Sequence, residues 1–440
     1  MSADLRFPDG FRWGAATSAH QVEGGNTRND WWRFERVPGA IRGGRGSGDA
    51  CRHYERFAED FDLAAADGHG AHRLSLEWSR LEPAPGRFDA GAIAHYHAVL
   101  GALRARGLAP VVTLHHFTNP LWIADQGGWE SRATIARFVD FARFCAGEFG
   151  GEVDDWCTVN EPEVYAFRAY AEGVWPPGVR DRSRALGVIA HLLEAHGLAW
   201  HAIHDADRTD ADGDGVAARV GFAKHHVQLV PSRAWNPLDH LLAHFERRVF
   251  NDAVERATVD GVVDLAIPGA TRVRRRIDAL AGALDWFGLN YYTRWHVKAF
   301  APDPHVVPRG APCNDLGWEL WPDGLRLALH AAARAGRPVL VTENGVADAH
   351  DTLRPGAIVA FAEAMHRAIA EGVDVRGYLH WSLLDNFEWA EGWHGRFGLY
   401  GVDPAAPNAP RVRRRSAEVL ARLARANAVT DDVRAAARAS

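Results

Sequence analysis

The chain has 440 residues, of which 47% are hydrophobic, 24% charged and 10% aromatic, with a formal net charge of −6 at pH 7. This composition is globular and excludes a disordered or coiled-coil chain. The negative charge balance argues against nucleic acid as a partner, because phosphate binding requires a basic face. Two arginine-rich runs, at 272–276 and 411–415, are interpreted as solvated helix faces or ends.

The cysteines and the apolar runs indicate the cellular compartment to expect. None of Cys51, Cys145, Cys157 and Cys313 forms a C-x-x-C pair, so we expect reduced thiols in a cytoplasmic protein. The first residues lack the apolar core of a signal peptide. No stretch approaches 18 apolar residues without a charge, so neither a membrane span nor a membrane partner is expected. No pattern in the sequence defines an oligomeric state.

Short apolar runs alternate with amphipathic segments along the chain. Strands are predicted at 11–17, 71–77, 110–114, 155–160, 218–225, 286–291, 338–343 and 377–382. Helices are predicted at 50–66, 90–106, 131–149, 184–206, 237–256, 320–335 and 356–371. This alternation predicts an α/β fold, a single (β/α)₈ TIM barrel with elaborated βα loops, over residues 1–425. For residues 426–440 we expect a C-terminal tail, with a loose helix as one candidate form. The alternative, an open doubly wound sheet, lacks a G-x-G-x-x-G after its first strand.

Two predicted strands each end at a glutamate that is followed by a breaker. Glu161 precedes Pro162, and Glu343 precedes the Asn344-Gly345 turn. Catalytic residues of a barrel lie at the C-terminal ends of its strands, so both acids would meet at one rim. Two carboxylates at one pocket suit cleavage of a glycosidic bond, one as proton donor and the other as nucleophile or base.

Further polar and aromatic residues fall at the same predicted rim, including His116, Asn160 and Asn290. Arg73 and Tyr292 are expected to support Glu343, because a cation and a hydrogen-bond donor lower the pKa of a carboxyl. An apolar setting would raise the pKa of the proton donor, which separates the two roles. Trp381 and Trp389 flank Asn386 and Glu388, so both tryptophans are expected to stack on a sugar rather than only to fill the core.

Other motifs point away from a metal. The run at 210–215 matches the first half of a calcium loop, but its twelfth position is Gly221 instead of a bidentate glutamate. An Asp/Gly turn before a strand is the preferred interpretation. The pairs at 115–116 and 225–226 place adjacent histidines on opposite faces of a strand, so one ion could not readily bind both. We therefore expect neither a metal nor a cofactor.

Several motifs in the same order resemble glycoside hydrolase family 1, the retaining β-glucosidase and β-galactosidase family. The resemblance runs from Phe7 to about Arg415. Its motifs are F-R-W-G-A-A-T-S-A-H-Q at 11–21, T-L-H-H-F at 113–117, T-V-N-E-P at 158–162, N-Y-Y at 290–292, V-T-E-N-G at 341–345 and W-S-L-L-D-N-F-E-W at 381–389. The family pattern has a tryptophan where this chain has Phe117, which leaves the shape of the sugar subsite and the sugar preference open.

The resemblance implies a role for each matching residue. Glu161 would be the acid/base and Glu343 the nucleophile, with Tyr292 beside it. The residues implied for substrate binding are Gln21, His116, Asn160, Asn290, Trp318 (as the aglycone platform), Trp381, Glu388, Trp389 and Phe397. Glu388 would repel a 6-phosphate, so the expected substrate is an unphosphorylated small-molecule β-glycoside or oligosaccharide.

The expected activity is therefore retaining, exo-acting hydrolysis of β-glucosides, with β-galactosides and β-fucosides as further candidates. A transglycosylase of the same fold and a sugar-binding pseudoenzyme remain as alternatives. An aldolase- or isomerase-type barrel would require a Schiff-base lysine or a metal, and the two lysines, Lys224 and Lys298, lie in no persuasive setting.

Overall fold

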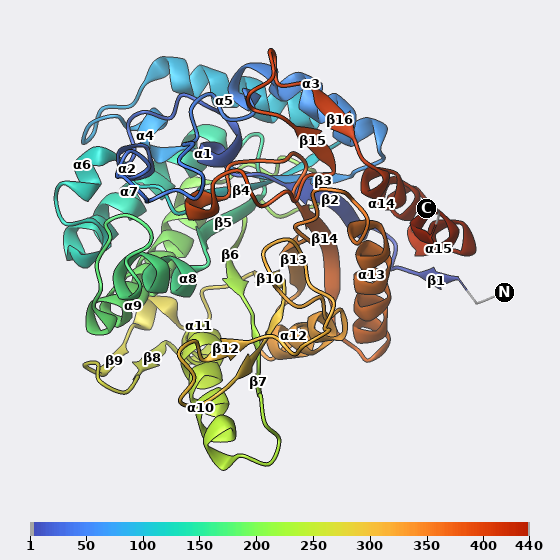
Figure 1. The fold of residues 1–440 in the computed structure, drawn as a ribbon. Coiled ribbons are helices and arrows are strands. Elements are labelled where there is room, and N and C mark those ends of the chain that lie inside the picture. The colour runs from blue at the N-terminus through green and yellow to red at the C-terminus, as the bar shows by residue number, and fades with distance from the viewer. Residues whose placement is uncertain (1–3, 439–440) are drawn as a thin grey trace.

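The computed structural model describes residues 4–438 and contains a closed barrel of eight parallel strands (Figure 1). Around the barrel, the strands follow one another in chain order, with the last beside the first. Each predicted strand coincides with one of them, so the predicted TIM barrel is confirmed. The strands are β2 (Arg12–Ala16), β3 (Ala71–Ser75), β4 (Ala109–His115), β5 (Asp155–Asn160), β6 (Arg219–His225), β10 (Trp286–Asn290), β13 (Val339–Asn344) and β14 (Val375–Trp381).

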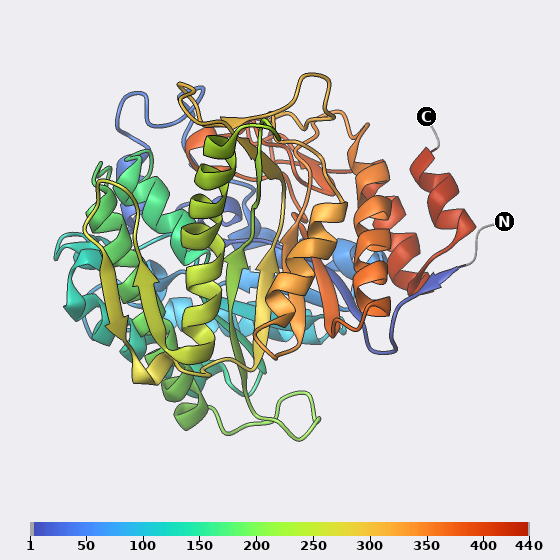
Figure 2. The same cartoon turned by 90° about the horizontal axis from the view of Figure 1, so that it is seen from below.

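Long helices cover the outside of the barrel, and Figure 2 shows several of them side by side. Side-chain caps fix several starts: Asp89, Asp181 and Asn236 each accept a hydrogen bond from a backbone N–H in the first helical turn. The long helices are α3 (His53–Ala66), α5 (Ala90–Arg104), α7 (Arg132–Phe149), α9 (Arg182–Ala206), α10 (Pro237–Arg247), α11 (Ala253–Asp260), α12 (Asp323–Ala333), α13 (Arg354–Ala370) and α14 (Arg415–Ala426). The helix predicted at 237–256 is interrupted, because a π-helical turn at Arg248–Asp252 separates α10 from α11.

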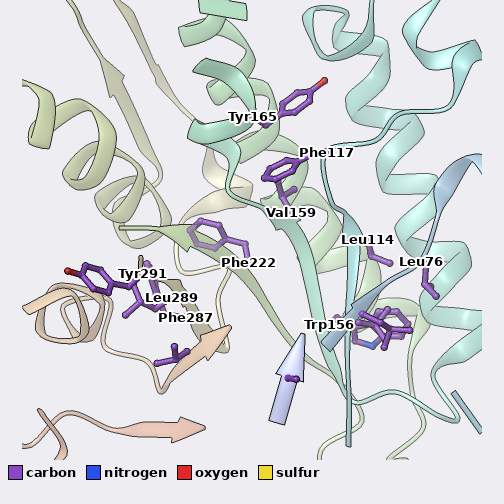
Figure 3. Close-up of a cluster of buried hydrophobic side chains, with 14 of the residues drawn as sticks. Leu76, Leu114, Phe117, Trp156, Val159, Tyr165, Phe222, Phe287, Leu289 and Tyr291 are labelled. Carbon is purple, nitrogen blue, oxygen red and sulfur yellow. The ribbon is translucent and has the colours of Figure 1, made fainter. Parts of the chain in front are cut away.

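Hydrophobic side chains form two layers. A small cluster fills the barrel interior and includes Val111, Leu340 and Leu379. A larger cluster lies between the strands and the helices; Figure 3 shows part of it, including Trp156 of β5 and Phe222 of β6. Alternate residues of each strand therefore face the interior or the helices, as the two-residue period of a strand requires.

Shorter elements occupy the loops. The short helices are α1 (Ala19–Val22), α2 (Asp30–Phe34), α4 (Trp78–Leu81), α6 (Leu121–Ala124) and α8 (Pro162–Ala166). The small strands are β7 (Gln228–Pro231), β8 (Val262–Leu265), β9 (Val273–Arg276), β11 (Arg294–Val297), β12 (His305–Val306), β15 (Tyr400–Val402) and β16 (Arg411–Arg413). Among the described residues, no helix has both the length and the apolar character needed to cross a membrane.

The interpretation of both arginine-rich runs as solvated helix faces or ends is wrong for the first run, and the second run reaches a helix only at Arg415, the first residue of α14. The first lies on β9, which pairs with β8, and the second begins on β16, which pairs with β15. Arg411 forms a buried ion pair with Asp60, and Arg414 forms another with Asp385. The acidic partners of Arg411 and Arg414 lie on distant segments of the chain, so no local charge pattern could indicate these ion pairs.

The two ends of the chain lie together. β1 (Leu5–Arg6) pairs antiparallel with β17 (Ala428–Val429). Figure 1 shows β1 close to α15 (Asp431–Arg438) at its right edge. The tail at 426–440, considered as a possible loose helix, contains β17 and then α15. Helix α15 packs against α13 and α14 and buries Val433 completely.

Candidate active site

Glu161 lies between the end of β5 and the start of α8, where Pro162 occupies the first helical position. Its backbone is left-handed, with φ of 44°, a conformation that costs a non-glycine residue about 1–2 kcal/mol. Two backbone hydrogen bonds hold it: the N–H of Glu161 donates to Ala223 O at 2.8 Å, and Tyr165 N–H donates to Glu161 O at 3.0 Å. The fold thus fixes the direction of this side chain at the strand end.

Glu343 lies on β13 and is almost completely buried. The guanidinium of Arg73 forms an ion pair with Oε1, and the hydroxyl of Tyr292 donates to Oε2 at 2.8 Å. Both oxygens therefore have a donor, which is the arrangement predicted for Arg73 and Tyr292. Because each oxygen accepts a hydrogen bond from a different donor, the plane of the carboxylate is fixed.

A continuous hydrogen-bond network connects the two glutamates. Arg73 Nη2 donates to Asn160 Oδ1 at 2.7 Å, and Asn290 Nδ2 donates both to that oxygen at 3.2 Å and to Glu161 Oε1 at 2.7 Å. Because these side chains come from β3, β5 and β10, the barrel itself sets the spacing of the two carboxyls.

The two carboxyls also interact electrostatically. Burial raises the pKa of Glu343 to about 7, and the charge of Glu161 acts in the same direction although Arg73 and Tyr292 oppose it. Burial also acts to raise the pKa of Glu161, but His225 and the Asn290 amide lower it by more. The order of the two pKa values is the reverse of the expected one, because His225 favours the carboxylate form of Glu161. The pair as a whole retains one proton toward neutral pH, which leaves one acid and one base in the pocket.

Beside this pair lies a second group of predicted binding residues, contributed by the segments after β2 and β14. Gln21 Nε2 donates to Asn386 Oδ1 and to Phe387 O, both at 2.9 Å. Trp381 Nε1 donates to Glu388 Oε1 at 3.0 Å. Burial raises the pKa of Glu388 to about 8, even though the Trp381 N–H acts against the rise. Hydrogen bonds therefore hold these polar side chains in fixed positions.

Aromatic rings enclose the pocket. The ring of His116 stacks on Trp381 and Trp389, with centroids 5.8 Å and 6.2 Å apart, and His116 Nε2 lies 3.3 Å from Asn160 Nδ2. On the other side, Tyr292 contacts both Trp318 and Phe397 through its ring, at 5.8 Å and 6.0 Å. All twelve predicted binding and catalytic side chains, together with Arg73, therefore belong to one connected set of contacts.

One contact was missed by the sequence analysis. His225, the last residue of β6, lies with Nδ1 3.2 Å from Glu161 Oε1, and its ring stacks on Tyr292 at 5.7 Å. The neighbouring His226 faces away and bonds Glu255 at 2.9 Å, as the alternation of a strand requires. The available signal was the position of His225 at the end of a predicted strand, whereas the sequence pattern addressed His225 only as a metal ligand.

Within residues 4–438, one group of carboxylates could approach a metal ion: Asp154, Asp210 and Asp212, whose oxygens lie within 4.8 Å of one another. Asp210 accepts hydrogen bonds from the N–H groups of Gly213 and Gly215, and Asp212 pairs with Arg219 at 2.8 Å. The run thus forms an Asp/Gly turn before β6, at the end of the strand opposite to Glu161.

Comparison with known proteins supports one family. Residues 3–429 match the family model described as "Glycosyl hydrolase family 1". A β-galactosidase of Pyrococcus woesei is 32% identical over 482 residues, covering 90% of this chain and 93% of that protein. β-Glucosidase A of Thermotoga maritima is 32% identical over 424 residues, with the same coverage of both chains.

Solved structures agree with the sequence comparison. The β-glycosidase from Pyrococcus horikoshii superimposes with a TM-score of 0.88 at 34% identity, covering 98% of this chain and 97% of that chain. The β-glucosidase from Thermotoga maritima in complex with glucoimidazole gives a TM-score of 0.87 at 29% identity, covering 97% of this chain and all of the other.

Proposed function

The chain belongs to glycosyl hydrolase family 1, and from that premise we propose that it is an exo-acting β-glycosidase that hydrolyses unphosphorylated β-glucosides with retention, by double displacement. The observation that carries the proposal is the position of Glu161 and Glu343 in one hydrogen-bond network at the C-terminal ends of two barrel strands. β-Galactosides and β-fucosides are further candidates for the sugar.

Glu343 is the proposed nucleophile. An attacking carboxylate must keep a fixed plane and remain ionised, and the contacts of Arg73 and Tyr292 support both requirements. Neither donor has to move when Glu343 loses its negative charge on forming the neutral glycosyl ester, while Glu161 gives up its proton and becomes the carboxylate. The ion pair with Arg73 also limits how far burial can raise the pKa of the carboxyl.

Glu161 is the proposed acid and base. It protonates the glycosidic oxygen in the first step, and its carboxylate then takes a proton from the water that hydrolyses the glycosyl-enzyme. The coupled pair retains one proton toward neutral pH, and the first step requires that proton to be on Glu161.

The sugar would bind in the pocket formed by Gln21, His116, Trp381, Glu388 and Trp389. Sugar hydroxyls need fixed donors and acceptors, which the hydrogen-bonded Gln21 and Glu388 supply. Sugar C–H faces pack on aromatic rings, which the tryptophans supply. Nδ1 of His116 is buried without a partner in the described part of the chain, so it is free to bond a hydroxyl.

The test is to measure kcat/KM on a panel of aryl β-glycosides that differ only in the sugar. Turnover of the β-glucoside with the β-product seen first by NMR supports the proposal, and an α-product would contradict retention. Glu343→Ala should lose turnover while its far-ultraviolet circular dichroism is unchanged; wild-type rates for this variant would reject the nucleophile. A wild-type protein that binds sugars but cleaves none would indicate a pseudoenzyme, and dominant sugar transfer at high acceptor concentration would indicate a transglycosylase.

A further inference from the structure

We propose that His225 is a positioning residue for the acid/base: together with Asn290 it holds Oε1 of Glu161, so that the catalytic proton is carried and delivered by Oε2 alone. This inference rests on the proposed function and adds a residue to it. His225 and Asn290 are register partners on the neighbouring strands β6 and β10, so the barrel places both donors at the same level.

The hydrogen bonds distinguish the two oxygens of Glu161. Oε1 accepts from Asn290 Nδ2 at 2.7 Å and lies 3.2 Å from His225 Nδ1, whereas the described residues offer Oε2 no hydrogen-bond partner. A ring nitrogen that faces a carboxylate oxygen must carry a hydrogen to bond it, which makes Nδ1 the donor. An oxygen that already accepts two N–H groups is a poor site for a third hydrogen, so the proton belongs on Oε2.

The ring of His225 is itself held in place. Its face stacks on Tyr292, with an interplanar angle of 15°, and Phe250 meets it edge-on with the centroids 6.0 Å apart. His225 contacts Glu161, and Tyr292 donates a hydrogen bond to Glu343. The same pair of stacked rings therefore holds both the acid/base and the nucleophile. The side chain of His225 is 14% exposed, so these contacts leave only a small part of the ring open to solvent.

The proton transfer follows from this geometry. As Glu343 attacks the anomeric carbon, the bond between that carbon and the glycosidic oxygen breaks, and its electron pair goes to the oxygen. The hydrogen on Oε2 of Glu161 moves to that oxygen at the same time, so the alcohol leaves neutral and Glu161 becomes a carboxylate. In the second step a water proton returns to Oε2 while the water oxygen bonds the anomeric carbon and the ester to Glu343 breaks.

His225 also affects the pH range of the reaction. The hydrogen bond and the electrostatic effect of His225 both lower the pKa of Glu161, so removing the ring should raise that pKa. The other titratable or charged groups that act on Glu161, or that surround His225, are Arg73 from β3, Glu343 from β13, Tyr292 from the loop after β10, Glu163 from α8, and Lys224 and His226 from β6. All of these groups remain in a His225 variant. A shift in the alkaline limb of the pH–activity profile can therefore be attributed to the loss of His225.

The experiment compares two substrates of the preferred sugar. The phenyl β-glycoside has a basic leaving group that needs a proton, whereas the 2,4-dinitrophenyl β-glycoside leaves as a stable anion. We expect His225→Ala to lower kcat/KM about tenfold on the phenyl glycoside, the effect of losing one charge-assisted hydrogen bond, and about twofold or less on the dinitrophenyl glycoside. His225→Asn, which keeps an uncharged N–H donor, should restore most of the loss.

Both His225 variants should move the alkaline limb of the phenyl-glycoside profile to higher pH. His226→Gln, on the opposite face of the strand, should change neither the ratio of the two substrates nor that limb. An equal loss on both substrates, or an unmoved limb, would overturn the role of His225. A wild-type protein that cleaves no β-glycoside would instead reject the proposed function, so the two failures are distinguishable.

Discussion

Tyr292 donates a 2.8 Å hydrogen bond to Oε2 of Glu343, and it is the one hydroxyl that contacts this carboxylate among the described residues. The other oxygen of Glu343, Oε1, forms an ion pair with Arg73. The phenol ring lies between His225 and Phe397, which fixes the direction of the hydroxyl. Tyr292 thus connects the proposed nucleophile, Glu343, to Phe397 and to His225, which in turn contacts the proposed acid/base, Glu161.

Replacing Tyr292 by phenylalanine should lower kcat/KM about tenfold or more, because a hydrogen bond to a charged group contributes about 1.5–3 kcal/mol. This hydrogen bond lowers the pKa of Glu343, so its loss should move the acidic limb of the kcat/KM profile to higher pH. The measurement is the pH dependence of kcat/KM on an aryl β-glycoside. Tyr291→Phe is the matched control, since Tyr291 donates to the backbone of Trp321. An equal loss in both variants would reject the role of Tyr292.

Replacing Glu388 by glutamine should stabilise the fold at high pH. Burial raises its pKa from 4.5 to about 8 in the folded protein, so the unfolded chain ionises first. The contribution of this carboxyl to folding is therefore complete below pH 4.5 and is lost as the pH rises to 8. Glutamine cannot ionise, so Glu388→Gln should raise the free energy of unfolding at pH 8 by about 1–3 kcal/mol and change it little at pH 4.5.

Urea denaturation at the two pH values measures this difference. Glu391→Gln, a more exposed carboxyl on the same loop, is the control. A Glu388→Gln variant that is less stable than the wild type at pH 8, or equally changed at both pH values, would contradict the prediction. A stabilised variant with impaired turnover would show that the binding site is maintained at the expense of stability.

Lys224 and Glu163 form a fully buried ion pair, 2.9 Å apart, directly beside the acid/base. Lys224→Met should destabilise the fold by about 3–5 kcal/mol, because it leaves the carboxyl of Glu163 buried without a counter-charge. The double variant Lys224→Met/Glu163→Leu should recover much of that loss, since no uncompensated charge remains. Urea denaturation of the two variants decides the point: a double variant no more stable than the single one would show that the pair contributes in another way.

The barrel was predictable because its signals are local. Each strand is a short apolar run, and the eight runs alternate with amphipathic helices, so the closed parallel sheet could be derived without any long-range information. Glu161 and Glu343 were predictable for the same reason, since each follows a strand and precedes a breaker. The family motifs then named the binding residues, and the fold brought them together.

The remainder depends on contacts between distant segments. His225 acquires a role only because β6 lies beside β5, which places its ring next to Glu161. Arg411 and Arg414 of the second arginine-rich run pair with the distant Asp60 and Asp385, and β17 pairs with β1 from the other end of the chain. The order of pKa values in the catalytic pair also depends on His225, so local sequence indicated which carboxyls react but not how their protons are shared.

The most direct test of the central claim is covalent trapping of the nucleophile. A 2-deoxy-2-fluoro-β-glucoside with a dinitrophenyl leaving group should inactivate the protein, because the fluorine slows hydrolysis of the glycosyl-enzyme more than the good leaving group slows its formation. Peptide mapping by mass spectrometry should then place a single fluoroglucosyl group on Glu343. Labelling of Glu161, or full turnover with no covalent adduct, would contradict the assignment of Glu343 as the nucleophile.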